Sequence, residues 1–306
     1  NSWVRSCVIA DLQWSPPVRL APPCRRRPGA HRGQGHVLGA TGTVVPVPSS
    51  VTVTWVGHAS VLIETAGHRV LTDPALTARL AHLRRRVPVP DLGPVDTVLI
   101  SHLHLDHLHL PSLRRLGPVP RLVVPAGAAS LVRAMGAEEV HEVRAGDEVD
   151  LGGVTVRAVP ADHSCARGPH SRTTAQPVGY VLDAGGVSTY FAGDTDLFDG
   201  MRDLGGVDVA LLPIWGWGPT LGERHLDPTR AATATEWIDP AVVVPIHWGT
   251  YSPVRARRGS PAWLGRPLDA FRAELRDRNR VDRLRILTPG ESLSVDPRIS
   301  GARVSS

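Results

Sequence analysis

Short runs of β-branched and aliphatic residues recur from residue 51 onward, and glycine, proline or aspartate separates them. Such runs, bounded by turn-forming residues, are typical of β-strands. We predict strands at residues 51–56, 60–65, 69–72, 98–100, 122–124, 154–159, 178–182, 187–191 and 242–246. A strand meander followed by mixed strands and helices occurs twice along the chain, which predicts two sheets with helices outside them.

Helical patterns lie between and after these strands, at residues 111–116, 126–135 and 229–238. The third of these helices has a strong start signal, because Asp227 supplies a capping carboxylate and Pro228 fits the first helical position. Leu268, Phe271 and Leu275 are spaced three and four residues apart, which predicts a last amphipathic helix.

Residues 1–50 differ in composition from the rest of the chain. They are rich in proline, glycine and arginine and show no sustained periodicity, so we expect a disordered basic tail. Two interpretations of this tail stay open, a functional basic arm and an upstream segment that is not part of the native protein. We expect residues 51–296 to form the catalytic domain and residues 297–306 a C-terminal tail.

The net charge of +5 is confined to this basic tail. Residues 1–50 hold six arginines and one acidic residue, whereas the other 28 arginines are matched by 28 aspartates and glutamates. The neutral remainder gives no reason to expect a nucleic-acid partner. The sequence leaves the oligomeric state open.

The chain contains no run of apolar residues long enough for a membrane span or for a secretory signal near its start. It has three cysteines, an odd number, which does not predict a disulfide framework. We therefore expect a cytoplasmic protein with no transmembrane segment.

A dense group of metal-ligand residues directly follows the predicted buried strand at residues 98–100. His102, His104, Asp106 and His107 form the pattern His-x-His-x-Asp-His. Neutral imidazole and carboxylate are ligands that zinc accepts. Alternate spacing on an extended segment points His102 and His104 to one side, while Asp106 and His107 can reach a second ion.

Single candidate ligands follow three later predicted strands. They are His163, Asp194 and His247. Each alone is an ordinary turn residue, but together with the His-x-His-x-Asp-His motif they predict a complete site with two metal ions.

These residues resemble the metallo-β-lactamase superfamily, and the likeness spans about residues 51–291. The resemblance implies a four-layer αβ/βα sandwich of the α/β (α+β) class with a dimetal site at the sheet edges. It implies that His102, His104 and His163 hold the first metal, that Asp106, His107 and His247 hold the second, and that Asp194 bridges them. Asp73, in Leu-Thr-Asp-Pro, matches an aspartate that supports the ligands from behind. The bridging aspartate disfavours antibiotic hydrolysis.

Within the superfamily, the chain is most similar to the branch of N-acyl-phosphatidylethanolamine phospholipase D and its bacterial relatives, with ascorbate-6-phosphate lactonase a more distant cousin. The similar segments are residues 53–60, 71–74, 98–102, 163–165, 191–195, 225–228 and 246–250. The likeness fails at residues 167–176 and 213–224, which are expected to shape substrate access.

The resemblance implies a hydrolase with two Zn²⁺ per chain, for which Mn²⁺ or Fe²⁺ are alternatives. A metal-bound hydroxide would attack a phosphodiester or related ester of a small-molecule or lipid-like substrate, oriented by Asp106 or Asp194. His225 matches an active-site histidine of the phospholipase branch and would bind substrate or protonate the leaving group, unless it only packs against the following helix.

The substrate pocket has three further candidates. His58 is either a pocket residue or a hydrogen-bonded structural residue. Trp215 and Trp217 either wall the pocket or cap the core, and the glycines between and after them favour a loop.

Other functions remain in competition with phosphodiester cleavage. A lactonase or other carboxylic-ester hydrolase is the first alternative. The balanced charge outside residues 1–50 argues against the hypothesis of an RNase Z-like enzyme. The complete ligand set argues against the hypothesis of a non-catalytic metal-binding scaffold.

Overall fold

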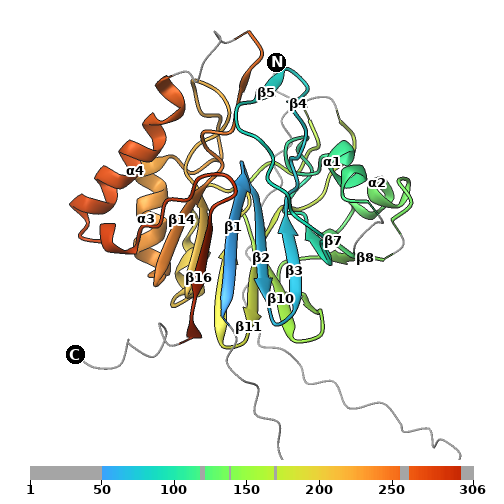
Figure 1. Ribbon diagram of the computed structural model, residues 1–306, viewed down its shortest axis with the longest axis horizontal. Coiled ribbons are helices and arrows are strands. Elements are labelled where there is room, and N and C mark those ends of the chain that lie inside the picture. The colour runs from blue at the N-terminus through green and yellow to red at the C-terminus, as the bar shows by residue number, and fades with distance from the viewer. Residues whose placement is uncertain (1–49, 118–120, 138, 169–170, 256–261, 298–306) are drawn as a thin grey trace, which may run out of the picture. The chain divides into compact units, whose positions relative to one another are not determined.

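Two β-sheets lie face to face at the centre of the molecule in Figure 1, a computed structural model that describes residues 50–117, 121–137, 139–168, 171–255 and 262–297. The first sheet has the order β16-β1-β2-β3-β6-β7-β8 and the second has the order β14-β13-β12-β11-β10-β9. The strands of the first sheet are β1 (Val51–Gly57), β2 (Ser60–Thr65), β3 (His68–Thr72), β6 (Thr97–Leu99), β7 (Arg121–Pro125), β8 (Val140–Val143) and β16 (Ser292–Val295). Those of the second are β9 (Glu148–Asp150), β10 (Val154–Pro160), β11 (Val178–Ala184), β12 (Val187–Phe191), β13 (Val209–Pro213) and β14 (Val242–Ile246).

Each sheet changes from antiparallel to parallel pairing. In the first sheet, β1, β2 and β3 form an antiparallel meander, and β3, β6, β7 and β8 then pair in parallel. In the second sheet, β9 to β12 are antiparallel, whereas β12, β13 and β14 are parallel. The loops that leave the parallel strands therefore gather at one edge of each sheet.

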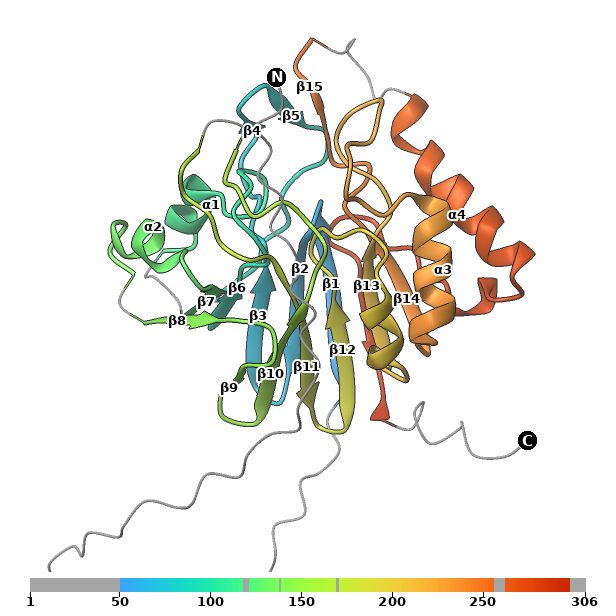
Figure 2. The same ribbon diagram turned by 180° about the vertical axis from the view of Figure 1, so that it is seen from behind.

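Helices cover the outer faces of both sheets (Figures 1 and 2). The first sheet carries α1 (Leu110–Arg115) and α2 (Ala129–Arg133), and the second carries α3 (Pro228–Ile238) and α4 (Arg266–Asp277). Between the sheets lies the largest apolar cluster, to which Ile63 of β2 and Tyr180 of β11 both belong. This arrangement confirms the four-layer αβ/βα sandwich.

Three short 3₁₀ helices connect these elements, η1 (Asp199–Leu204), η2 (Ala262–Leu264) and η3 (Val281–Arg283). The start of α3 is as predicted, because the Asp227 carboxylate accepts a hydrogen bond from the Arg230 N–H at 2.8 Å. In contrast, α2 is shorter than the predicted helix at residues 126–135. Gly127 has a φ of 102°, which belongs to a turn and delays the start of α2.

A small third sheet, of order β15-β5-β4, was not predicted. Its strands β4 (Arg79–Leu80), β5 (Leu83–Arg85) and β15 (Tyr251–Pro253) are too short for a periodic signal. Leu80, Leu83 and Tyr251 form its apolar cluster together with Ala75, and Trp217 packs against it.

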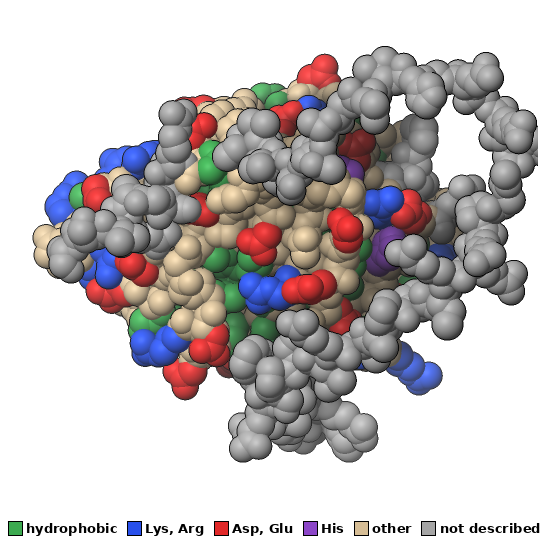
Figure 3. All heavy atoms as spheres, turned by 90° about the horizontal axis from the view of Figure 1, so that it is seen from below, with side chains coloured by type: hydrophobic (Ala, Val, Ile, Leu, Met, Phe, Trp, Pro, Cys, Tyr) green, Lys and Arg blue, Asp and Glu red, His purple; other side chains and the backbone are tan. Residues whose placement is uncertain are grey.

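The predicted basic tail at residues 1–50 lies outside the described residues except for Ser50, and the predicted C-terminal tail does so except for Pro297. On the face drawn in Figure 3, the coloured acidic and arginine side chains are interspersed, without a continuous basic patch. Within the described part of the chain, none of the helices is long and apolar enough to cross a membrane.

Candidate metal centre

The predicted ligands all follow the carboxyl ends of strands. The His-x-His-x-Asp-His loop comes after β6, His163 after β10, Asp194 after β12 and His247 after β14. These strands belong to both sheets, and their ends meet at the edge where the parallel strands stop. The fold therefore brings together side chains that are far apart in the sequence.

Apolar side chains anchor the loop that carries the motif. Leu103 and Leu108 are 1% and 0% exposed, and they alternate with the ligand residues. The carbonyl oxygen of His104 accepts hydrogen bonds from the N–H groups of His107 and Leu108, which closes a tight turn. Arg167 donates to the carbonyls of Leu103 and Leu108 from outside this turn.

His102, His104 and His163 form the first ligand group. His163 Nε2 lies 3.1 Å from His104 Nδ1, and His102 Nε2 is buried without a hydrogen-bond partner among the described residues. His163 Nδ1 donates to the carbonyl of Arg224 at 2.7 Å, which leaves the Nε2 lone pair directed inward. Burial disfavours the charged imidazolium and lowers the pKa of His163 to about 3 and that of His102 well below its ordinary value. These rings are therefore neutral and ready to donate lone pairs.

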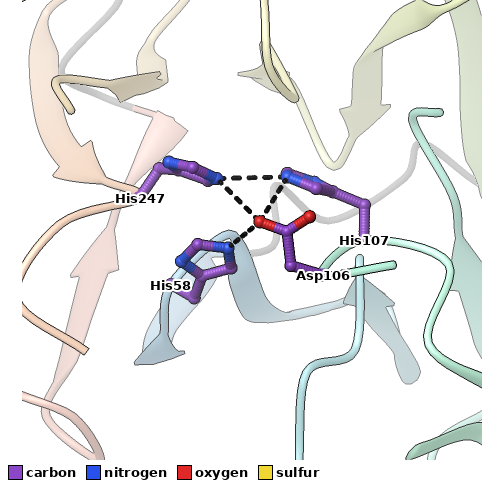
Figure 4. A group of neighbouring side chains, drawn as sticks. All are labelled: His58, Asp106, His107 and His247. Carbon is purple, nitrogen blue, oxygen red and sulfur yellow. Dashed lines mark hydrogen bonds and ion pairs between the residues drawn. The ribbon is translucent and has the colours of Figure 1, made fainter. Parts of the chain in front are cut away.

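His107, His247 and Asp106 form a second ligand group, together with His58 (Figure 4). The Nε2 atoms of His107 and His247 lie 3.1 Å apart, and each is 3.8 Å from Asp106 Oδ2. Behind them, His107 Nδ1 donates to Asp73 Oδ2 at 2.7 Å, so the outer side of this ring is held as well.

Asp194 lies between the two groups and is 2% exposed. Its Oδ2 is 3.2 Å from His107 Nε2 and 3.3 Å from His247 Nε2. Its Oδ1 is buried and has no hydrogen-bond partner among the described residues. Burial raises the pKa of this carboxyl group, but His247 and His107 outweigh burial and hold its pKa well below the usual range. The carboxylate therefore stays ionised at the centre of the cluster.

These atoms fit divalent metal ions. In the first group, the Nδ1 of the neutral His163 ring donates to a carbonyl, so its Nε2 carries a lone pair that faces His104 Nδ1 at 3.1 Å, where a shared cation fits. The unpartnered His102 Nε2 and Asp194 Oδ1 point to the same conclusion, because buried polar atoms are otherwise hydrogen-bonded. Imidazole nitrogen and carboxylate oxygen are the donors that zinc, manganese and iron accept.

Three residues in or beside the ligand groups have positive φ angles. His58, Asp73 and His247 have φ angles of 56°, 32° and 59°. Residues other than glycine avoid this region, at a cost of about 1–3 kcal/mol each, and they keep it where the surrounding structure holds them. The packing of the fold therefore maintains the geometry of the cluster.

His225 and Asp73 lie where the sequence predicts them, beside the ligands. His225 Nε2 is 3.5 Å from Asp194 Oδ2, and its Nδ1 donates to the carbonyl of Glu223 at 2.7 Å. Burial opposes the charged form, but the hydrogen bond and charge of Asp194 raise the pKa of His225 to about 9. Its side chain is 19% exposed, so it can meet a substrate.

The three other residues predicted for the substrate pocket are Trp215, Trp217 and His58, and they take different positions relative to the ligands. Trp215 touches the site through its main chain, since its carbonyl accepts a hydrogen bond from His247 Nδ1 at 2.8 Å. Trp217 packs on the third sheet and makes an edge contact with His82 at 5.0 Å between ring centroids. His58 is 1% exposed and faces Asp106, so it is buried among the ligands and does not line an open pocket.

Sequence reasoning did not identify Ser101 as a functional residue. Its hydroxyl donates to Asp73 Oδ2 at 2.5 Å and accepts from His102 Nδ1 at 2.9 Å, so it links the two. The available signal was a small polar residue at the strand end directly before the motif. Cys165 is disulfide-bonded, although the odd number of cysteines did not predict a disulfide framework.

Comparison with known proteins gives the family. A family model described as the beta-lactamase superfamily domain matches residues 68–248. A UPF0173 metal-dependent hydrolase of Methanopyrus kandleri is 34% identical over 248 residues, which cover 78% of this chain and 98% of that relative. The chain belongs to the UPF0173 family of metal-dependent hydrolases in the metallo-β-lactamase superfamily. A UPF0173 metal-dependent hydrolase of Thermus thermophilus is 35% identical over 212 residues, covering 67% of this chain and 87% of the relative.

Solved structures show the same fold as this UPF0173 protein. Igni18, a metallo hydrolase from Ignicoccus hospitalis, matches with a TM-score of 0.62 and 24% identity over 80% of this chain and 98% of its own. An isothiocyanate hydrolase from Delia radicum gut bacteria matches with a TM-score of 0.61 and 19% identity, over 80% and 99%. At these identities the likeness concerns the fold alone.

Proposed function

We propose that this protein is a dinuclear zinc hydrolase that cleaves a phosphodiester or a related ester, and that residues 51–296 form its catalytic domain. The observation that carries the proposal is the buried cluster of inward-facing donor atoms, two of which, His102 Nε2 and Asp194 Oδ1, have no partner among the described residues. Such a cluster is costly unless cations occupy it.

In this proposal, each ligand group would hold one ion. His102, His104 and His163 would hold the first, and Asp106, His107 and His247 the second. Asp194 would bridge them, because its Oδ2 faces the second group while its Oδ1 remains available. Zinc is the default for imidazole and carboxylate donors, with Mn²⁺ or Fe²⁺ as alternatives. When bound, two such ions supply Lewis acidity and an activated water.

The protein side chains would then orient the reactants. Asp106 is 16% exposed and therefore faces the side from which a substrate enters. Its carboxylate and that of Asp194 can accept hydrogen bonds from the attacking water and so direct its lone pair. The hydrogen bond from Leu226 N–H to the Thr195 carbonyl, at 2.8 Å, holds His225 beside Asp194. From there His225 Nε2–H can deliver a proton to the leaving-group oxygen.

The substrate would be a small-molecule or lipid-like ester. The phosphodiester preference rests on the resemblance of residues 53–60 and 246–250 to segments of the phospholipase D branch. Leu105 supports an apolar portion in the substrate, since it is 51% exposed and stands between His104 and Asp106. The net charge of the chain lies within residues 1–50 and the remaining residues are balanced, which gives no support to a nucleic-acid substrate.

The test is turnover by protein reconstituted with zinc. We expect hydrolysis of bis-p-nitrophenyl phosphate, and its loss in Asp194→Ala. Turnover of a panel of lactones without turnover of the phosphodiester would assign the carboxylic-ester alternative. Bound zinc without hydrolysis of any ester would contradict the proposal and favour a metal-binding scaffold.

A further inference from the structure

We propose that His58 is a positioning residue for the second metal ion, which it serves by holding Asp106 and His247 in place. This inference rests on the proposed function, because it assumes that Asp106, His107 and His247 bind an ion. His58 lies in the turn between β1 and β2, far in sequence from all three (Figure 4).

The main chain of His58 is held rigidly on both sides. Its N–H donates to Thr250 Oγ1 at 2.7 Å, and its carbonyl accepts from Trp55 Nε1 at 2.9 Å. Next to it, Gly57 has a φ of 119°, and a Cβ atom there would lie 2.6 Å from Arg85 Nη2. The turn thus requires glycine at residue 57 and presents His58 in one orientation.

Asp106 is the ligand that most needs support. Its side chain is 16% exposed, whereas those of His107 and His247 are 0% and 1% exposed. Its Oδ2, the oxygen directed at both of these rings, accepts a hydrogen bond from His58 Nε2 at 2.9 Å. A partly exposed carboxylate without this bond could rotate toward water, and its orientation toward the ion would be lost.

His58 also contacts His247, from a different sheet. The carbonyl of His58 accepts a hydrogen bond from the His247 N–H at 2.9 Å, and the two ring centroids are 3.9 Å apart. His247 has a φ of 59°, so a main-chain bond at this residue helps to hold a strained conformation. His58 therefore links the hairpin of the first sheet to the end of β14 in the second.

These contacts make a selective prediction. His58 touches Asp106 and His247 of the second group, whereas the hydrogen bonds of His102 and His163 run to Ser101 and Arg224. Loss of the His58 side chain should weaken the second ion and spare the first. Removal of such a supporting group typically lowers metal affinity about 10- to 100-fold.

The experiment is a calorimetric titration of metal-free full-length protein with Zn²⁺, for wild type, His58→Ala and His58→Gln. Asp106→Ala identifies the binding event of the second group, and His141→Gln, at a β8 side chain that is 42% exposed, is the matched control. We expect two events in the wild type, a second event about 10- to 100-fold weaker in His58→Ala, and partial recovery in His58→Gln, whose amide can donate to Asp106. The unchanged first event in each variant reports that the fold is intact.

Three results would overturn the role of His58. The first is an unchanged second event in His58→Ala, and the second is equal weakening of both events. The third is complete loss of the second event in both variants, which would make His58 a direct ligand. A single event in the wild type would contradict the dinuclear site as well. Two normal events without ester hydrolysis would contradict only the proposed function.

Discussion

Replacing Asp73 by asparagine tests how one buried carboxylate orients both ligand groups. Asp73 is fully buried, and its Oδ1 accepts from Ser101 N–H at 2.7 Å. Its Oδ2 accepts from the Ser101 hydroxyl at 2.5 Å and from His107 Nδ1 at 2.7 Å. The Ser101 hydroxyl in turn accepts from His102 Nδ1 at 2.9 Å. Asp73 therefore orients His102 of the first group and His107 of the second.

The magnitude follows from these contacts. All three bonds to Asp73 come from donors, so the amide introduced by Asp73→Asn has to point its NH₂ group at one of them. Each hydrogen bond to a charged group contributes about 1.5–3 kcal/mol, and an unpaired buried donor adds a further cost. We expect Asp73→Asn to lower the free energy of unfolding by about 2–4 kcal/mol and to weaken both zinc ions about 10- to 100-fold.

The assay combines denaturant unfolding of the metal-free protein with zinc titration, and Asp208→Asn is the matched control. Asp208 is 4% exposed, and its Oδ2 accepts from Ser188 N–H at 2.8 Å and from the Ser188 hydroxyl at 3.0 Å. This control should lose stability but keep its zinc affinities. Wild-type affinity for both ions in Asp73→Asn, or equal weakening in Asp208→Asn, would refute the reasoning.

Three other predictions follow from the same geometry. Chelation of the metals should lower the melting temperature, because an ion at a thousand times its Kd stabilises the fold by about 4 kcal/mol; identical melting curves in EDTA and in zinc would contradict this. His225→Ala should lower the turnover of an ester with a poor leaving group by about 10²–10⁴-fold, and that of a p-nitrophenolate ester much less. The variant should keep its bound zinc. Full activity of His225→Ala on both substrates would return this residue to a structural role. Gly193→Ala should destabilise the protein by several kcal/mol in denaturant unfolding, because Gly193 has a φ of 63° and its new Cβ would lie 2.5 Å from Ser101 Cβ; Gly265→Ala, with open space around the new methyl, is its control.

The candidate ligands could be named from the sequence because metal-binding residue types stand directly after apolar strands, and the resemblance to the metallo-β-lactamase superfamily divided them into two sets. His102 and His107 follow β6, and Asp194 follows β12, so the strand pattern together with residue type marks them as candidates. The start of α3 was also predictable, because the capping of Asp227 is a local interaction. Such signals depend on residues that are neighbours in the sequence, so they can be recognised without knowledge of tertiary contacts.

Other parts of the site depend on contacts between distant segments. The hydrogen bond of His58 to Asp106 joins residues 48 apart, and nothing local to His58 distinguishes a ligand neighbour from a pocket residue. The positive φ of His247 and the carbonyl of Trp215 that orients its ring likewise arise from tertiary packing. The strand β13 was not predicted, and the β15–β5 pairing joins segments too short for a periodic signal.

The measurement that tests the dinuclear site most directly is a crystal structure of the zinc-reconstituted protein, with anomalous differences collected on both sides of the zinc absorption edge. The account predicts two peaks about 3.5–4 Å apart. One should lie among His102, His104 and His163, the other among Asp106, His107 and His247, with Asp194 between them. A single peak at full occupancy, or peaks away from these side chains, would contradict it.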